Sequence, residues 1–175
     1  IYARAFESGL ITPASLMDDS ATDYRVPKGS FSPANYSGSF HGRVSARLAL
    51  ASSLNLPAIK LAETGGVSPL IDLLRDLDLE SLNQDADYYG LGLALGGGEV
   101  DLLSLTAAYA ALADSGRFRP PLMTLDRRPA LPSGRPVFTP GAAFLISDIL
   151  SSPPARLTGS GPGSRMGRSM VGALT

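Results

Sequence analysis

Short apolar stripes at helical spacing, most of them opened by a capping residue or a proline and several closed by glycine, are the feature that most constrains the fold. The clearest covers residues 101–114, where five residues recur with the period of an α-helix and are predicted to face inward: Leu102, Leu105, Ala108, Tyr109 and Leu112. Gly116 follows as the stop signal. Because strand candidates are few, the pattern predicts a mostly α-helical chain that needs a sheet from elsewhere.

The same signals predict further helices along the chain. The first is an opening helix that stops at Gly9. The second is capped by Ser45 and runs to about Ser52, and the third runs from Pro57 to Gly65. A fourth starts at Ser68-Pro69 and carries Leu70, Leu73, Leu74 and Leu77 on one face, and the last is capped by Thr139, has Pro140 as its first residue and runs through Leu150. The opening stretch has no cap before Ile1, and we interpret it as a helix cut in its middle, with the natural N-terminus missing.

Other stretches have no helical or strand period. Residues 18–43, with Asp, Ser, Gly, Pro and aromatics, are predicted to form one long surface loop, and residues 80–88 a polar loop. Residues 158–175 hold Gly, Ser, Arg and Met, which is typical of a disordered tail. The predicted domain is therefore residues 1–157, followed by an atypical Gly/Ser/Arg-rich tail over 158–175.

Composition excludes several classes of function. The formal net charge of -1 gives no basic surface for nucleic acid and no polybasic membrane anchor. The absence of Cys excludes disulfides, thiol nucleophiles and Cys-ligated zinc. Because the chain has a single His, the sequence also disfavours a transition-metal site. No apolar run is long enough to span a membrane, and no cofactor or metal is expected.

Three blocks of sequence resemble class A penicillin-binding proteins, and the 1C subclass most closely. The first block holds Pro33-Ala34-Asn35-Tyr36, Phe40-His41-Gly42-Arg43-Val44 and residues 49–58; the second holds Tyr89-Gly90-Leu91, residues 95–100 and residues 107–113; the third runs from Gly141 to Leu150. Their order and spacing fit the family over roughly residues 1–152. The resemblance implies the α+β fold of penicillin-binding transpeptidases and serine β-lactamases, of which this chain is a mostly α-helical internal part.

The resemblance also implies a catalytic role for Ser53-Leu54-Asn55. Enzymes of this family form a serine acyl-enzyme with three motifs, S-x-x-K, S-x-N and K-T-G. A serine hydroxyl is a poor nucleophile until a base takes its proton, so the Lys and the second Ser handle the proton while the Asn amide positions the Lys and the substrate. Ser53 is thus expected to relay or hold the proton, and Asn55 to orient the lysine and bind substrate. The alternative to a catalytic role for both residues is a purely structural one, helix capping.

The first and third motifs are absent from the chain. The residues three before Lys28 and Lys60 are Arg25 and Pro57, so no S-x-x-K exists, and the family places that motif shortly before the position of Ile1. No K-T-G occurs either, because Lys28-Gly29-Ser30 lies too early in the chain. We therefore expect that this chain alone neither forms an acyl-enzyme with penicillin nor cross-links peptides.

By resemblance, the parent protein is a bifunctional peptidoglycan synthase with a membrane anchor and a glycosyltransferase domain upstream. It would act at the outer, periplasmic face of the bacterial inner membrane on lipid-linked disaccharide-peptide and on stem peptides, and it would bind β-lactams. Two alternatives remain open. One is a serine β-lactamase or D,D-carboxypeptidase; the other is a non-catalytic binding module or the product of a decayed gene, which the missing motifs favour.

Other candidate residues have competing readings. Asn35, Tyr36 and Phe40 line a substrate groove or pack internally. His41 belongs to a Ser-His-Asp triad or is a plain loop residue. The remaining candidates are more typical of turns and solvated charges than of ligand sites: a second Ser-Leu-Asn at Ser81-Leu82-Asn83, the Gly96-Gly97-Gly98 run, the pair Asp18-Asp19, and Asp76 with Asp78.

Overall fold

Helices dominate the structure, a computed structural model that describes residues 1–26, 29–123 and 133–152. In chain order the elements of the described residues are α1 (Tyr2–Glu7), β1 (Leu16–Asp19), β2 (Tyr24–Val26), β3 (Gly29–Phe31), β4 (Gly42–Ser45), α2 (Ala46–Ala51), α3 (Asn55–Gly65), α4 (Val67–Arg75), α5 (Ala86–Tyr89), the 3-10 helix η1 (Gly90–Leu95), α6 (Leu102–Ala113), β5 (Arg117–Phe118), β6 (Arg135–Pro136) and α7 (Pro140–Ser151). The expectation of a mostly helical chain is met in the coarse sense that helices predominate over short strands.

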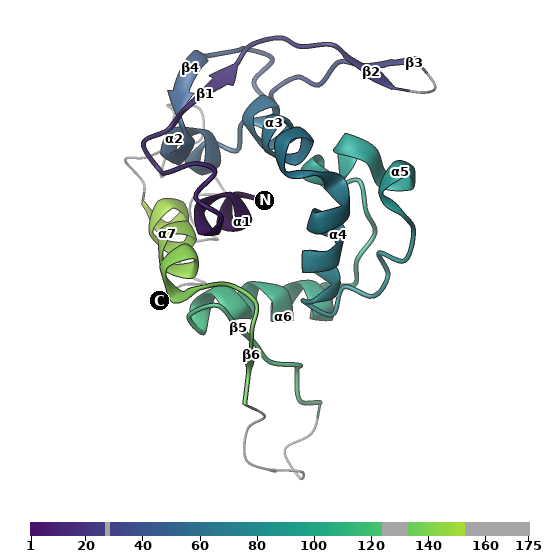
Figure 1. Cartoon of the computed structure of the whole chain (residues 1–175), viewed down its shortest axis with the longest axis vertical. Helices are drawn as coiled ribbons and strands as arrows, with labels where there is room; N and C mark the ends of the chain where they lie inside the picture. Colours follow the sequence, from purple (N-terminus) through teal and green to yellow (C-terminus); the bar gives the residue numbers. More distant parts are fainter. Residues whose placement is uncertain (27–28, 124–132, 153–175) are drawn as a thin grey trace.

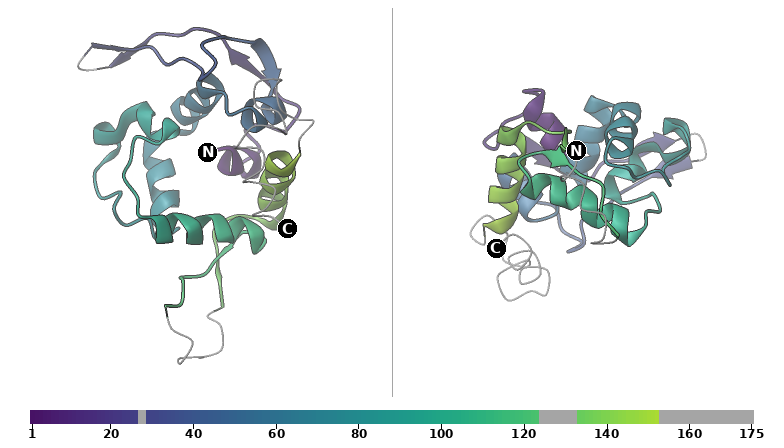
Figure 2. Two further views of the ribbon diagram at one scale, coloured as in Figure 1. Left: turned by 180° about the vertical axis from the view of Figure 1, so that it is seen from behind. Right: turned by 90° about the horizontal axis from the view of Figure 1, so that it is seen from below.

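The helices are arranged as a ring, with α1 and the first residue toward its middle (Figure 1). On one side α7 packs against α1, α2 and α6, and on the other α3 packs against α4 and η1. Seen from behind and from below, α6 runs along one edge and joins the two sides (Figure 2). The ring brings the linker between α2 and α3 next to the start of the chain.

The predicted caps explain where the helices begin. Ser45 accepts a hydrogen bond from the amide of Leu48 at 3.2 Å, and Thr139 accepts one from Ala142 at 3.3 Å, so both predicted caps are confirmed. α3 begins at Asn55 rather than at Pro57. Proline is tolerated anywhere in the first turn, because the amides there have no partner inside the helix.

The prediction of one unbroken surface loop over residues 18–43 is wrong. β1 pairs antiparallel with β4, and β2 pairs with β3 in a separate hairpin. In the first ladder Met17 lies opposite Val44, and both side chains are buried. The strands were not recognised because each has only three or four residues, and the partner of β1 lies more than twenty residues further along the chain.

The predicted inward face of α6 is only partly correct. Ala108 is buried, together with Ala107 and Ala111, but Leu102 is 79% exposed and Tyr109 is 56% exposed. Leu105 and Tyr109 do face the middle of the ring, where they line an apolar hollow of about 300 Å³ with residues such as Leu74 and Ile146. The helical period therefore predicted which way the side chains of these two residues point. Their burial depends on what fills the hollow.

Some sequence predictions lie outside the described residues. They concern the tail over 158–175 and Lys28. The domain boundary at residue 157 lies in the same undescribed part of the chain and stays a prediction.

Candidate functional site

The Ser53-Leu54-Asn55 segment is the sharp turn between α2 and α3. The amide of Ser53 donates to the carbonyl of Leu50 at 3.1 Å, and the amide of Leu54 donates to Ala49 at 3.0 Å. The Leu54 side chain is buried in the core. The turn is thus held by its own backbone and by an apolar anchor between two polar residues.

Ser53 adopts a left-handed backbone conformation, with φ of +54°. This conformation is the one in which helices commonly end, and the two backbone bonds of the turn, from Ser53 to Leu50 and from Leu54 to Ala49, form the Schellman pattern that closes α2. Asp78 after α4 and Ser115 after α6 also have positive φ. The Ser53 side chain is exposed. Ser53 does not cap α3, because α3 begins two residues later and its N-cap residue is Leu54.

Asn55 is held from the loop that precedes β4. Its backbone amide donates to Oδ1 of Asn35 at 2.8 Å, and its side-chain Nδ2 donates to the carbonyl of Ala34 at 2.6 Å. Residues 34 and 35 thus fix both the backbone and the side chain of Asn55. The side chain itself is only half-buried, so it remains accessible from the hollow described next.

Ser53 and Asn55 lie on the wall of a hollow of about 470 Å³ in the middle of the ring. The other walls come from six elements and include Tyr2, Leu50, Ala58, Leu74, Leu93 and Tyr109. A hydroxyl and an amide therefore face a space bounded mainly by apolar side chains, which is the usual composition of a small-molecule or peptide site.

The hollow is a strongly desolvating environment at its α1 side. Burial, with a smaller contribution from the charge of Asp19, raises the pKa of Tyr2 far above its ordinary value. The Tyr2 hydroxyl is buried and has no hydrogen-bond partner within the described residues. Ionised groups in this region are therefore disfavoured unless they are paired.

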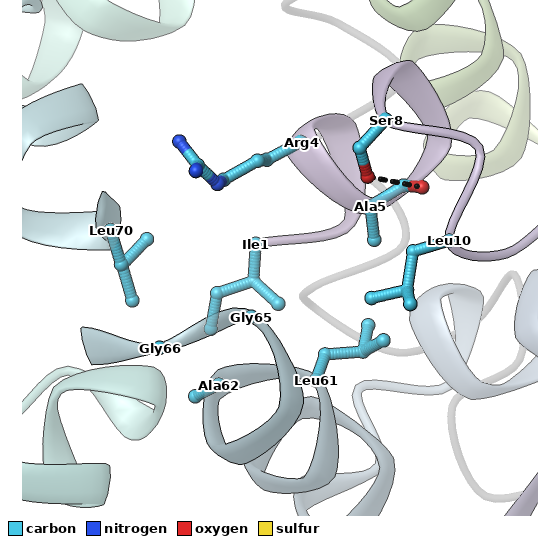
Figure 3. Close-up of a pocket in the computed structure, with 10 residues that line it drawn as sticks. All are labelled: Ile1, Arg4, Ala5, Ser8, Leu10, Leu61, Ala62, Gly65, Gly66 and Leu70. Carbon is cyan, nitrogen blue, oxygen red and sulfur yellow. Dashed lines mark hydrogen bonds between the residues drawn. The ribbon is translucent and has the colours of Figure 1, made fainter. Parts of the chain in front are cut away.

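A third, much smaller pocket lies between α1 and the C-terminal end of α3 (Figure 3). It holds only about 40 Å³ and is lined mostly by apolar side chains such as Leu61 and Leu70. Ser8 turns its hydroxyl back to the carbonyl of Ala5, as the dashed line in Figure 3 shows. This space is too small for a substrate, and it contains neither Ser53 nor Asn55.

Asp19 is a buried carboxylate, contrary to the sequence reading of Asp18-Asp19 as solvated charges. It is completely inaccessible to solvent, whereas Asp18 is exposed and forms an ion pair with Lys60 at 2.5 Å. The reading failed because the two residues alternate across β1, so that only the second points inward. Asp18 agrees with the solvated reading.

His41 pairs with Asp19, its Nδ1 lying 3.0 Å from Oδ2. These are two of the three members of the triad considered from the sequence. The same carboxylate, however, also accepts from the backbone amide of His41 at 2.9 Å and from Asn35. This set of bonds is typical of a buried carboxylate that organises a loop.

The three residues predicted to line a substrate groove differ in their surroundings. Asn35 is 5% exposed and its amide bonds within the protein, while Tyr36 is fully exposed and Phe40 is 39% exposed. Tyr36 does not line the hollow beside Ser53. Contact between these residues and a substrate stays a prediction.

The second Ser-Leu-Asn, at residues 81–83, has a different environment. Leu82 is buried in the core, and the Ser81 hydroxyl donates to the carbonyl of Glu99 at 2.7 Å. Neither Ser81 nor Asn83 lines the hollow. The two copies of the tripeptide therefore differ in their surroundings, and only the copy in the α2–α3 turn lines the hollow.

Two broader properties concern residues 1–26, 29–123 and 133–152. In these ranges no three His, Asp or Glu side chains converge where they could hold a metal ion. None of the helices there has the length and apolar character needed to cross a bilayer.

Sequence relatives give the family. The chain is 35% identical over 158 residues to penicillin-binding protein 1C of Escherichia coli, which covers 86% of this chain and 19% of that protein. It is 37% identical over 118 residues to penicillin-binding protein 1A of Aquifex aeolicus, covering 66% of this chain and 15% of that one. A match to penicillin-binding protein 1A of Clostridium acetobutylicum, 28% identical, covers the whole chain and 23% of the relative. No family model matches.

Solved structures share the fold at low sequence identity. Penicillin-binding protein 1A of Haemophilus influenzae matches with a TM-score of 0.68 and 21% identity, over 86% of this chain and 28% of that one. The TP domain of Burkholderia pseudomallei penicillin-binding protein 3 also matches with a TM-score of 0.68, at 18% identity, over 86% of this chain and 49% of that one.

The fold is thus one that occurs within penicillin-binding proteins. The relatives narrow the class further, and the chain belongs to the class A penicillin-binding proteins. It spans roughly a fifth of the length of the 1C relative.

Proposed function

We propose that this chain is the mainly helical part of a D,D-transpeptidase domain in a longer peptidoglycan synthase, with Ser53 as proton relay and Asn55 as orienting residue. The observation that carries the proposal is the α2–α3 turn, in which a left-handed serine and a tethered asparagine share the wall of one hollow. The similarity to the 1C relative over most of this chain supports the same reading.

The chemistry of acyl transfer accounts for both residue types. A serine hydroxyl at the edge of the hollow can accept a proton from one group and donate it to another, which suits a relay between a nucleophile and a leaving group. Because Nδ2 of Asn55 donates to Ala34, Oδ1 is the atom through which this amide would accept a hydrogen bond from a lysine ammonium. The apolar walls would strengthen such a bond.

Neither the nucleophilic serine nor its lysine is in the chain, since no S-x-x-K and no K-T-G occur among the 175 residues. The reaction therefore requires both motifs from polypeptide outside this chain. We propose that residues 1–157 are an internal part of the transpeptidase domain and that the whole protein also carries peptidoglycan glycosyltransferase activity. It would be anchored in the inner membrane and act at its periplasmic face.

The substrates of the whole protein would be peptidoglycan stem peptides, and β-lactams would be its covalent inhibitors. We propose that exposed Tyr36 and Phe40 contribute to the groove that receives the peptide, because both present large apolar surface on the loop before β4 whose residues 34 and 35 hold Asn55. Replacing Tyr36 by Ala should then raise the penicillin concentration needed for half-maximal labelling without changing the maximal label.

The proposal is tested by grafting residues 1–152 into the 1C protein of Escherichia coli in place of its matched segment. The graft should bind a fluorescent penicillin covalently, and Ser53→Ala or Asn55→Ala should slow acylation by about two to three orders of magnitude. The matched controls are Ser81→Ala and Asn83→Ala in the second Ser-Leu-Asn, which should acylate normally.

Equal loss of labelling from both tripeptides, or no loss from either, would contradict the proposed roles. The 175-residue chain alone should remain unlabelled, and covalent labelling of that chain would show that its own residues supply a nucleophile. Rapid release of the label as hydrolysed drug from the graft would favour the β-lactamase or carboxypeptidase alternative.

A further inference from the structure

We propose that Asp19 and Asn35 are positioning residues of this site, acting through Asn55. The buried carboxylate of Asp19 fixes the amide of Asn35, and the oxygen of that amide holds the first residue of α3. The catalytic meaning of this network rests on the proposed function, whereas its structural content can be tested without it.

The N-terminus of α3 needs an acceptor that its own cap residue lacks. The first amides of any helix have no partner within the helix, and a polar residue at the N-cap usually satisfies one of them. Here the N-cap is Leu54, whose side chain cannot accept a hydrogen bond. Oδ1 of Asn35, twenty residues earlier, takes this role for the amide of Asn55 at 2.8 Å.

The orientation of the Asn35 amide follows from Asp19. Nδ2 of Asn35 lies 2.9 Å from both carboxylate oxygens and 2.9 Å from the carbonyl of Ser39. All three atoms are acceptors, so only the NH₂ group can face them. Oδ1 must then point the other way, toward Asn55. A rotation of the amide by half a turn would place acceptor against acceptor at Asp19 and donor against donor at Asn55.

Hydrogen bonds and burial hold the Asp19 carboxylate in place. Its carboxylate is completely buried, and a buried charge is tolerated only when it is paired or well hydrogen-bonded. Besides Asn35, it accepts from the backbone amide of His41 at 2.9 Å, and Nδ1 of His41 lies 3.0 Å away. The β1–β4 ladder fixes this geometry, because Asp19 lies opposite Gly42, the residue after His41.

The network ends at both polar groups of Asn55. Asn35 holds its backbone amide, and the neighbouring Ala34 carbonyl accepts from its side-chain Nδ2 at 2.6 Å. A shift of the 34–35 segment would therefore move the whole of Asn55 relative to Ser53. Asn35 thus acts on the site through Asn55.

The first test is made on the 175-residue chain with the variants Asp19→Asn and Asp18→Asn. The first variant puts an NH₂ group where the carboxylate accepted and allows the Asn35 amide to turn. Amide hydrogen exchange at Asn55 should then become about tenfold faster, relative to amides in α7. Asp18→Asn makes the same charge change one residue earlier on β1, at an exposed side chain paired with Lys60, and should leave Asn55 unchanged.

Exchange at Asn55 that rises only in step with α7 would mean general destabilisation and would overturn the inference. If Asp19→Asn does not fold, the unmodified chain decides. A scalar coupling across the hydrogen bond, from the backbone ¹⁵N of Asn55 to the side-chain carbonyl carbon of Asn35, should be detectable, and its absence would overturn the bond on which the network depends.

The catalytic meaning is tested in the graft that carries this chain. Asp19→Asn should lower the first-order rate of acylation about tenfold while the affinity for penicillin before acylation stays the same, because Asn55 is displaced but the groove is not. Asp18→Asn should match the unmodified graft, and equal rates for the two variants would overturn the positioning role. An unmodified graft that does not label would instead count against the proposed function, and the exchange and coupling results would still decide the network.

Discussion

Gly116 lies directly against the backbone of Phe138. Its carbonyl accepts from the amides of Val137 at 2.8 Å and of Phe138 at 3.0 Å, and its own φ is +85°. A Cβ at this position would come closer than 3.0 Å to the Phe138 carbonyl, a distance that real Cβ atoms do not show. The segments that follow α6 and precede α7 therefore meet at a position that only glycine fits.

Gly116→Ala should accordingly lower the free energy of unfolding by about 2–4 kcal/mol, through backbone strain and the clash together. Urea denaturation followed by circular dichroism measures this. Gly96→Ala is the matched control, because Gly96 has φ of +89° but no atom within 4 Å of the added methyl group. It should cost only about 1 kcal/mol, and equal losses for the two variants would mean that the close contact is not formed.

Ser53 should show a conflict between stability and function. Because its φ of +54° suits glycine, Ser53→Gly should raise the free energy of unfolding by about 0.5–1 kcal/mol while removing the proposed relay hydroxyl. Ser52 precedes it with φ of -95°, so Ser52→Gly should destabilise the chain instead. Thermal unfolding of the two variants provides the measurement. A loss of stability in Ser53→Gly would contradict the left-handed turn.

The sequence predicted most of the helices, since their signals are local. Ser45 and Thr139 cap the helices that they were expected to cap, and the turn over residues 53–55 lies where two helical patterns meet. Such features depend on neighbours three or four residues away, which a single sequence displays.

Long-range pairing was not predictable in the same way. The burial of Asp19 depends on the β1–β4 register, and the capping of Asn55 depends on a residue twenty positions earlier. Neither arrangement leaves a periodic signal in a four-residue strand. The exposure of Tyr109 was missed for a related reason, because hydrophobic spacing indicates which way a side chain points but not whether another segment covers it.

Asp101 should make the start of α6 sensitive to acid. The backbone amide of Ser104 donates to its carboxylate at 2.8 Å, and this bond is the main cause that holds the pKa of Asp101 below its ordinary value of 3.8. A lowered pKa in the folded state means that the carboxylate contributes stability above pH 3.8 and loses it as the pH falls through the lower folded value.

Carbon-13 titration of the Asp101 carboxyl group measures that pKa, which should rise toward 3.8 when urea unfolds the chain. Amide exchange at Ser104 should accelerate over the same acidic range, relative to its intrinsic rate. Asp101→Asn keeps an acceptor at the cap without a titrating group and should abolish this pH dependence. A folded pKa at or above the unfolded one would contradict the cap.

The apolar hollow of about 300 Å³ that Leu105 and Tyr109 line should bind apolar molecules in the 175-residue chain. Leu105 and Tyr109 line it and remain partly exposed, and large apolar surfaces of this kind take up hydrophobic ligands. An anilinonaphthalene dye should therefore fluoresce on binding, and Leu105→Glu should weaken its affinity about tenfold, because a carboxylate beside the dye has to be desolvated. Leu102→Glu is the matched control on the same helix, since Leu102 is 79% exposed and lies outside the lining of the hollow. Equal weakening by both variants would place the dye elsewhere and would imply that α6 does not turn its Leu105 face toward the middle of the ring.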